Sequence, residues 1–241
     1  MKPRLPRNNK EYGTQEYWEN RFVTETSCEW LLSFQQLAPQ LDPLLSRYAV
    51  DDDKSKITIL IIGCGNAPFS ADLYDAGYSG IVNVDYSATV IAAMHERHAV
   101  RRPAMQWRVM DMTAMNVLDD ASFDVVIDKA AMDALMTGEG DVWNPAAEVI
   151  TASCAMCAHV ARVMKDGGTF VQISLSQPHF RKKYLLGWHA TTADAVLKTS
   201  DDTYSFKFAW TYRCEAAGRA DDAGGFGHYL YIMTKQAKSE N

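Results

Sequence analysis

The sequence has 241 residues, of which 47% are hydrophobic and 22% are charged, and its formal net charge at pH 7 is -6. This hydrophobic content allows a sizeable core and excludes a disordered chain, and the length fits a single α/β domain. The acidic balance disfavours unspecific binding of nucleic acid, which depends on neutralising phosphates, and it fits a small-molecule substrate or a basic protein surface.

The cysteines indicate a reducing compartment, so we expect a cytoplasmic protein. They are odd in number and lack the spacing of a disulfide framework: Cys28, Cys64, Cys154, Cys157 and Cys214. No apolar stretch approaches the ~18 residues of a membrane helix, so no membrane association is expected. No apolar segment follows the basic residues at positions 1–10, so a secretory signal is not expected either.

Residues 1–53 form an N-terminal segment that differs from the rest of the chain. It contains the aromatic residues Trp18, Phe22 and Trp30 and ends in three aspartates, which are typical of a solvated linker. We assign residues 54–241 to one α/β domain, because strands and helices alternate there.

Apolar runs predict buried parallel strands at 57–62, 81–84, 106–110, 123–127 and 169–174. Helices are predicted between them at 70–76, 87–98 and 146–164. Two more strands, at 204–212 and 228–233, follow without an intervening helix and are joined by a glycine-rich loop at 224–227. The order predicts an α/β, Rossmann-like fold: a seven-stranded, mostly parallel sheet with an antiparallel C-terminal hairpin.

Ligands of such sheets bind at the carboxyl ends of the strands, where the strand order reverses. After the first strand, Gly63 and Gly65 allow a sharp turn and close approach of a ligand, although an ordinary tight turn has the same pattern. Asp85 follows the second strand, about 20 residues beyond Gly63, where a carboxylate can accept from both hydroxyls of a ribose or can cap the next helix. Asp111 and Met112 follow the third strand. They suit an adenine amino group and its apolar wall, although an isolated aspartate there is also typical of a loop.

The fourth strand ends in Asp128 and Lys129, with Asp133 shortly after. Asp128 and Asp133 are candidate contacts for an incoming amine, and an ion pair or a helix cap is the alternative interpretation. A dinucleotide-binding loop fits less well, because its third glycine is replaced by Pro68. Cys154 and Cys157 lie within one predicted helix without a second pair, which indicates helix packing and not a zinc site, so no metal is expected.

The sequence resembles the class I S-adenosylmethionine-dependent methyltransferases. The blocks that carry the resemblance are EYWENRF at 16–22, IIGCGN at 61–66, VDYS at 84–87, SFDVV at 122–126, DK and DAL within 128–135, and QPHFR at 177–181. They resemble one methyltransferase-like subgroup, which includes lysine methyltransferases of elongation factor 1-alpha and a form fused to an endothelin-converting enzyme. The match runs from about residue 12 to 181 and resumes at 228–231, whereas residues 185–227 do not align well.

The resemblance implies S-adenosylmethionine as the cofactor and a role for each matching position. The N-terminal segment would cover the cofactor with Trp18, Phe22 and Trp30, although the family often has tyrosine in place of Phe22. Gly63, after the first strand, would approach the methionine moiety, and Asp85 and Tyr86, after the second, would bind the ribose. Asp111 and Met112, after the third strand, would bind the adenine. Lys129 would contact the cofactor from the fourth strand.

The resemblance also implies a protein-lysine N-methyltransferase with a basic protein surface as its partner. A small-molecule methyltransferase and a cofactor-binding scaffold without turnover remain as alternatives. The sequence leaves open the identity of the acceptor, any general base, the role of residues 185–227 and the oligomeric state.

Overall fold

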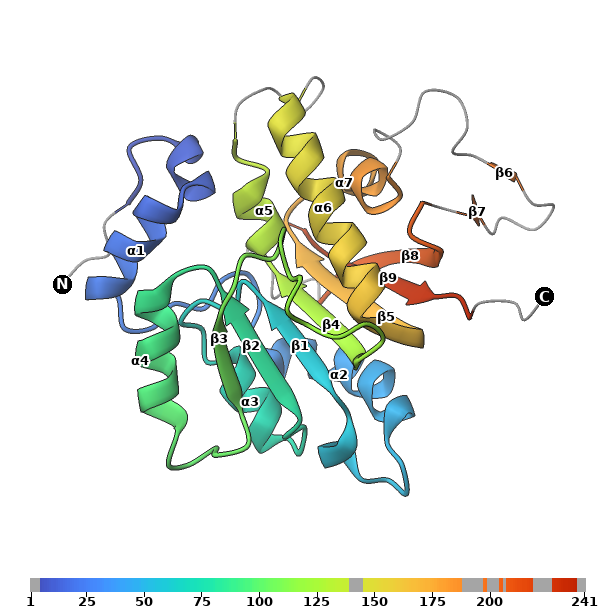
Figure 1. Ribbon diagram of the computed structural model, residues 1–241, viewed down its shortest axis with the longest axis horizontal. Coiled ribbons are helices and arrows are strands. Elements are labelled where there is room, and N and C mark those ends of the chain that lie inside the picture. The colour runs from blue at the N-terminus through green and yellow to red at the C-terminus, as the bar shows by residue number, and fades with distance from the viewer. Residues whose placement is uncertain are drawn as a thin grey trace.

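The structure is a computed structural model that describes residues 5–138, 145–187, 207–218 and 227–237, together with the backbone of two short strands, β6 (Leu197–Lys198) and β7 (Tyr204–Ser205). Its main sheet has seven strands in the order β3-β2-β1-β4-β5-β9-β8 (Figure 1). The parallel strands are β1 (Ile59–Ile62), β2 (Ile81–Asp85), β3 (Gln106–Val109), β4 (Phe123–Lys129) and β5 (Met164–Ser174). Two antiparallel strands, β9 (His228–Lys235) and β8 (Trp210–Ala217), complete the sheet beyond β5. The predicted Rossmann-like fold is confirmed.

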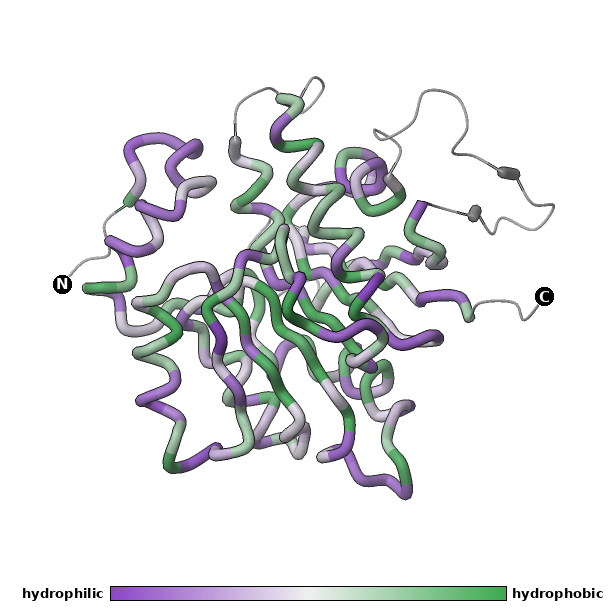
Figure 2. The backbone as a smooth tube through the Cα atoms, in the orientation of Figure 1, coloured by the Kyte–Doolittle hydropathy of each residue, from purple (hydrophilic) through white to green (hydrophobic). Residues whose placement is uncertain are grey.

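Helices cover both faces of the sheet, so its central strands are apolar throughout. In β1, Ile59 and Ile61 pack into the core on one face, whereas Leu60 and Ile62 pack into the core on the other. Because both sets are buried, the strand shows a continuous apolar run and not an alternating pattern. Figure 2 shows the same arrangement, with hydrophobic segments gathered in the central strands and hydrophilic segments at the periphery.

The two helical layers come from different parts of the chain. The first core contains residues of α2 (Phe34–Leu45) and α3 (Phe69–Asp75), and α4 (Ala88–His98) packs beside them through Trp107. The second core contains residues of α5 (Ala131–Leu135), α6 (Ala147–Val163) and α7 (Pro178–Leu185). The strand order reverses between β1 and β4, which places the predicted binding edge at the carboxyl ends of these two strands.

The N-terminal segment has two separate roles in the structure. The short helix η1 (Asn9–Gly13) and α1 (Gln15–Thr24) pack near the carboxyl ends of the strands, as expected for a cover. By contrast, α2 buries Leu37, Leu41 and Leu45 completely against the first face of the sheet. The covering role predicted for residues 1–53 therefore falls on residues before α2, since the leucine face of α2 makes that helix part of the core.

The prediction of one strand at 204–212 is wrong. Residues 204–205 belong to β7, which pairs with β6 in a separate two-stranded sheet, and β8 begins only at Trp210. Ala209 has a φ of 51°, in the left-handed region, which interrupts an extended chain directly before β8. The predicted loop at 224–227 lies outside the described residues except for Gly227. Among the helices that the structure describes, none is long and apolar enough to cross a membrane.

If α2 is part of the core, Leu41→Ala should lower the free energy of unfolding by roughly 2–5 kcal/mol, because it leaves a cavity under the sheet. Urea denaturation followed by circular dichroism measures the change. Val23→Ala in α1 is the matched control, since Val23 is 72% exposed, and its effect should stay within about 0.5 kcal/mol. Equal effects of the two substitutions would show that α2 does not contribute to the core.

Candidate active site

A cavity of about 500 Å³ opens at the carboxyl ends of β1, β2 and β4, beneath the N-terminal cover. Every residue predicted to bind the cofactor lines this cavity: Trp18, Phe22, Trp30, Gly63, Asp85, Tyr86, Asp111, Met112 and Lys129. The structure therefore brings together residues that lie up to 111 positions apart in the sequence, from Trp18 to Lys129.

The glycine loop after β1 is shaped by a close approach to the loop after β4. Gly63 has a φ of 59° and Gly65 a φ of 52°, a region that favours glycine. A Cβ atom on Gly63 would lie 2.3 Å from the Cβ of Ala131, the first residue of α5, which is closer than two carbon atoms can come. The position therefore requires glycine for two reasons, the backbone conformation and the lack of space.

Asp85 connects the glycine loop with the start of α4. Its side chain is buried; Oδ2 accepts the N–H of Gly65 at 2.9 Å and Oδ1 accepts the N–H of Ser87 at 3.0 Å. The N-cap of α4 is Ser87 and not Asp85, because the Ser87 hydroxyl accepts the N–H of Val90. Each carboxylate oxygen of Asp85 keeps a free lone pair, which suits a pair of ribose hydroxyls. Burial raises the pKa of Asp85 to about 6.

The residues predicted to contact adenine, Asp111 and Met112, follow β3. Asp111 accepts both the N–H and the hydroxyl of Thr113 through Oδ1, at 2.7 and 2.8 Å, so part of its role is to fix the loop. Asp111 and Met112 nevertheless line the cavity together with Met110. The loop interpretation and the binding interpretation are therefore compatible at this position.

An aromatic wall closes the cavity from the N-terminal side. The ring of Trp18 stacks on Phe22 with 5.5 Å between centroids, and it meets Trp30 edge-on at 5.9 Å. The buried guanidinium of Arg21 lies 5.0 Å from the ring of Trp30 and forms an ion pair with Glu25. Sequence reasoning missed Arg21, although the EYWENRF block contains it.

Hydrogen bonds tie this cover to the binding loops. Asn66, directly after the glycines, accepts the N–H of Cys28 at 3.1 Å and donates to the carbonyl of Glu25 at 2.7 Å. Gln15 donates to the carbonyl of Tyr86 at 2.8 Å. The cover and the cofactor loops are thus fixed to one another. Asn66 and Gln15 carried no signal in the sequence beyond their place in or beside a motif.

Lys129 uses its side chain to hold the same cover. Its ammonium donates to Glu29 at 2.5 Å and to the carbonyl of Trp30 at 2.7 Å. Burial lowers the pKa of Lys129 and raises that of Glu29, whereas the attraction between the two charges opposes both shifts. Lys129 lines the cavity, and because its ammonium is engaged by the cover, its backbone is the part that remains for the predicted cofactor contact.

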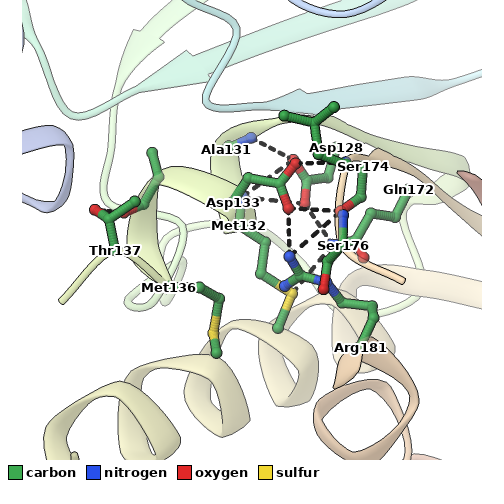
Figure 3. A network of polar contacts seen from close by, with 12 residues as sticks. Asp128, Ala131, Met132, Asp133, Met136, Thr137, Gln172, Ser174, Ser176 and Arg181 are labelled. Carbon is green, nitrogen blue, oxygen red and sulfur yellow. Dashed lines mark hydrogen bonds and ion pairs between the residues drawn. The ribbon is translucent and has the colours of Figure 1, made fainter. Parts of the chain in front are cut away.

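The two predicted acceptor contacts differ in their surroundings (Figure 3). Asp128 is completely buried and is not among the described residues that line the cavity. It accepts the N–H groups of Ala131 and Met132 at the start of α5, and the side-chain amide of Gln172 at 2.7 Å. The predicted contact between Asp128 and an acceptor is therefore not supported; the helix-cap alternative describes it. Asp133 does line the cavity.

The lining of the cavity fits S-adenosylmethionine and offers no cluster of metal ligands among the described residues. The cavity offers a loop with no space for a Cβ, a carboxylate with open lone pairs, and an aromatic wall, which match the amino-acid end, the ribose and the sulfonium of that compound. Within the described part of the chain, no group of three or more His, Cys, Asp or Glu side chains is arranged to hold a metal ion, and the five cysteines are free.

Known proteins similar to this chain are methyltransferases, in agreement with the fit of the cavity to S-adenosylmethionine. A family model described as a methyltransferase domain matches residues 59–168. The chain is 32% identical over 221 residues to EEF1A lysine methyltransferase 4 of Mus musculus, covering 90% of this chain and 81% of the relative. It is 40% identical over 181 residues to the eEF1A lysine and N-terminal methyltransferase of Mus musculus, covering 74% of this chain but 24% of that longer protein.

Solved structures confirm the fold at low sequence identity. The N-methyltransferase NodS of Bradyrhizobium japonicum, in complex with S-adenosyl-L-homocysteine, superposes with a TM-score of 0.58 at 15% identity, covering 95% of this chain and 100% of that one. The [4+2]-cyclase SpnF superposes with a TM-score of 0.55 at 14% identity, covering 95% and 96%. The same fold thus serves different reactions, and the sequence relatives carry the assignment of activity.

The fold and the cavity define a class I S-adenosylmethionine-dependent methyltransferase. Within that class, the chain belongs to the subgroup that contains the eEF1A lysine methyltransferases.

The Asp85 assignment predicts a loss of cofactor affinity. Asp85→Ala removes the charged acceptor of the ribose hydroxyls, each of which contributes about 1.5–3 kcal/mol, so S-adenosylhomocysteine should bind at least about tenfold more weakly. Isothermal titration calorimetry measures the affinity. Asp75→Ala, which removes an exposed carboxylate paired with Arg102, is the control and should leave it unchanged. Unchanged affinity of Asp85→Ala would refute the ribose contact.

The raised pKa of Asp85 predicts a pH dependence. The ionised carboxylate accepts the ribose hydroxyls, so bound cofactor stabilises that form, and affinity should fall as the pH drops below about 6. Calorimetry with S-adenosylhomocysteine between about pH 8 and 5 should show up to about a tenfold loss per unit at the acid end. In Asp85→Asn this slope should flatten. A full slope in Asp85→Asn would assign the titration to another group, such as Asp128, whose pKa burial also raises to about 6.

Proposed function

We propose that this chain is a protein-lysine N-methyltransferase whose acceptor is a lysine side chain of an eEF1A-like protein. The observation that carries the proposal is the correspondence over most of both chains with EEF1A lysine methyltransferase 4. The formal net charge of -6 supports a basic partner surface. The free cysteines support a cytoplasmic location.

The cavity has the chemical features that a lysine side chain requires. Its wall includes the apolar side chains of Leu135, Ala152 and Leu175, which suit the methylene stem of lysine, and the carboxylate of Asp133. Leu175 is 50% exposed, so this part of the wall reaches the surface, where a protein can approach. An acceptor entering here would have its stem in apolar surroundings and its nitrogen near a carboxylate.

Bound S-adenosylmethionine supplies an electrophilic methyl group. The protein must then deliver an uncharged amine with its lone pair directed toward that group, and such positioning accounts for several kcal/mol of the barrier. A lysine ammonium has a reference pKa of about 10.4, and burial in an apolar cavity lowers it. Asp133 accepts an N–H of the amine and thereby orients the nitrogen.

The proposal is tested by incubating the protein with methyl-labelled S-adenosylmethionine and unmethylated eEF1A. We expect label on a lysine of eEF1A, located by mass spectrometry and abolished when that lysine is replaced by arginine. The Asp85→Ala variant serves as the inactive control.

The other outcomes separate the alternatives. Label in the small-molecule fraction of a lysate, and not on protein, would support a small-molecule methyltransferase. Micromolar binding of S-adenosylhomocysteine without any labelled product would support a cofactor-binding scaffold.

A further inference from the structure

Arg181 of α7 lies at the centre of a buried polar cluster beside the cavity. Its side chain is 2% exposed, and Nη2 donates to Asp133 Oδ1 in an ion pair and to Ser174 Oγ at 3.3 Å (Figure 3). Nε and Nη1 are buried without a hydrogen-bond partner among the described residues. Unsatisfied buried donors are unfavourable for stability, so fold stability alone does not explain this arginine.

Asp133 is held from three sides and keeps one position open. Oδ1 accepts the Ser174 hydroxyl at 2.5 Å as well as Arg181, and Oδ2 accepts the N–H of Leu175 at 3.0 Å. A carboxylate has about four lone-pair positions, so three are occupied and one, on Oδ2, is free. Because Asp133 lines the cavity, that position is available to a ligand.

The charges of the cluster are unequal. Asp128 and Asp133 carry two negative charges when ionised, and Arg181 carries one positive charge, so the cluster keeps a formal charge of about minus one. The side chain of Asp128 is turned away from the cavity, toward Gln172 and the start of α5. A single hydrogen-bond donor with positive character, such as an amine, fits this arrangement.

We propose that Arg181 is a positioning residue of the acceptor site, which fixes the Asp133 carboxylate toward the cavity and balances its charge. An unbalanced carboxylate would hold the acceptor as a charged ammonium, which is not nucleophilic. With Arg181 in place, the amine is held by a hydrogen bond and loses its proton more readily. The inference rests on the proposed amine acceptor.

The titratable groups around Arg181 and Asp133 do not change charge between about pH 7 and 9. The facing groups lie on β4, α6, α7 and β9 and comprise Asp128, Cys157, Tyr184, His228 and Tyr231. Burial raises the pKa values of the thiol and of both phenols, and it lowers that of the histidine, so all four are uncharged between about pH 7 and 9. Asp128, with a pKa of about 6, is ionised there.

Substitutions of Arg181 and Asp133 can therefore test whether the cluster raises or lowers the pKa of a bound amine. Arg181→Gln leaves Asp133 unbalanced, which should raise the pKa of the bound amine by about one unit. Asp133→Asn leaves the arginine charge unbalanced and should lower it by a similar amount. Arg181→Lys keeps the charge and should leave it near the wild-type value. The double variant Arg181→Gln/Asp133→Asn should also return it close to that value.

The experiment uses n-butylamine labelled with ¹³C next to nitrogen, bound to the protein loaded with S-adenosylhomocysteine. The ¹³C chemical shift reports protonation of the bound amine without any turnover. In parallel, the acid limb of the pH–rate profile with eEF1A should move to higher pH in Arg181→Gln and to lower pH in Asp133→Asn. Arg162→Gln is the matched control, because Arg162 pairs with Asp120 at the opposite end of the strands.

The outcomes distinguish the two proposals. If eEF1A is not methylated but the butylamine pKa moves in the expected directions, the protein acceptor is wrong and the role of Arg181 stands. If the pKa and the acid limb stay fixed while Arg181→Gln and Arg181→Lys lose thermal stability alike, Arg181 is a structural residue and the inference is overturned. Should Arg181→Gln fail to bind S-adenosylhomocysteine, the lowered amine pKa expected of Asp133→Asn and the unchanged value expected of Arg181→Lys decide the matter. Failure of butylamine to bind also overturns the inference.

Discussion

The close approach of Gly63 to Ala131 is the constraint on which the rest of the site depends. It brings the loop after β1 against the start of α5, with no space for a side chain between them. Ala130, just before α5, has a φ of 71°, so the β4 loop also adopts a conformation that is rare outside glycine. These two loops meet where the strand order reverses, and the cavity opens there because the helices on either side diverge.

The cover over the cavity is part of the binding loops and not an independent domain. Asn66 extends the glycine loop into hydrogen bonds with the segment before α2, and Lys129 extends the β4 loop to Glu29 and Trp30. The aromatic wall is thus positioned by the same loops that line the cavity after β1 and β4. Contacts of this kind within the chain hold the wall and the loops in one arrangement, and such order reduces the entropy lost on binding.

The two carboxylates predicted to contact an acceptor, Asp128 and Asp133, have different contacts. Asp128, on β4, accepts the first N–H groups of α5, whereas Asp133, on α5 itself, lines the cavity and keeps one lone pair free. The two carboxylates look equivalent in the sequence. Their surroundings differ because Asp128 lies on β4 and contacts the start of α5 and Gln172 of β5, whereas Asp133 lies on α5 and lines the cavity.

The sequence by itself determined the layered fold and the edge of the sheet at which the cavity opens, because parallel strands have continuous apolar runs and their carboxyl ends converge at one edge. Gly63, Asp85 and Asp111 were therefore found from their positions after strands. Only the tertiary structure decided what α2, Asn66, Glu29 and Arg181 contact, and it gave Asp128 and Asp133 different surroundings. These roles depend on contacts between distant segments and on the direction of single side chains, and neither leaves a periodic pattern in the chain.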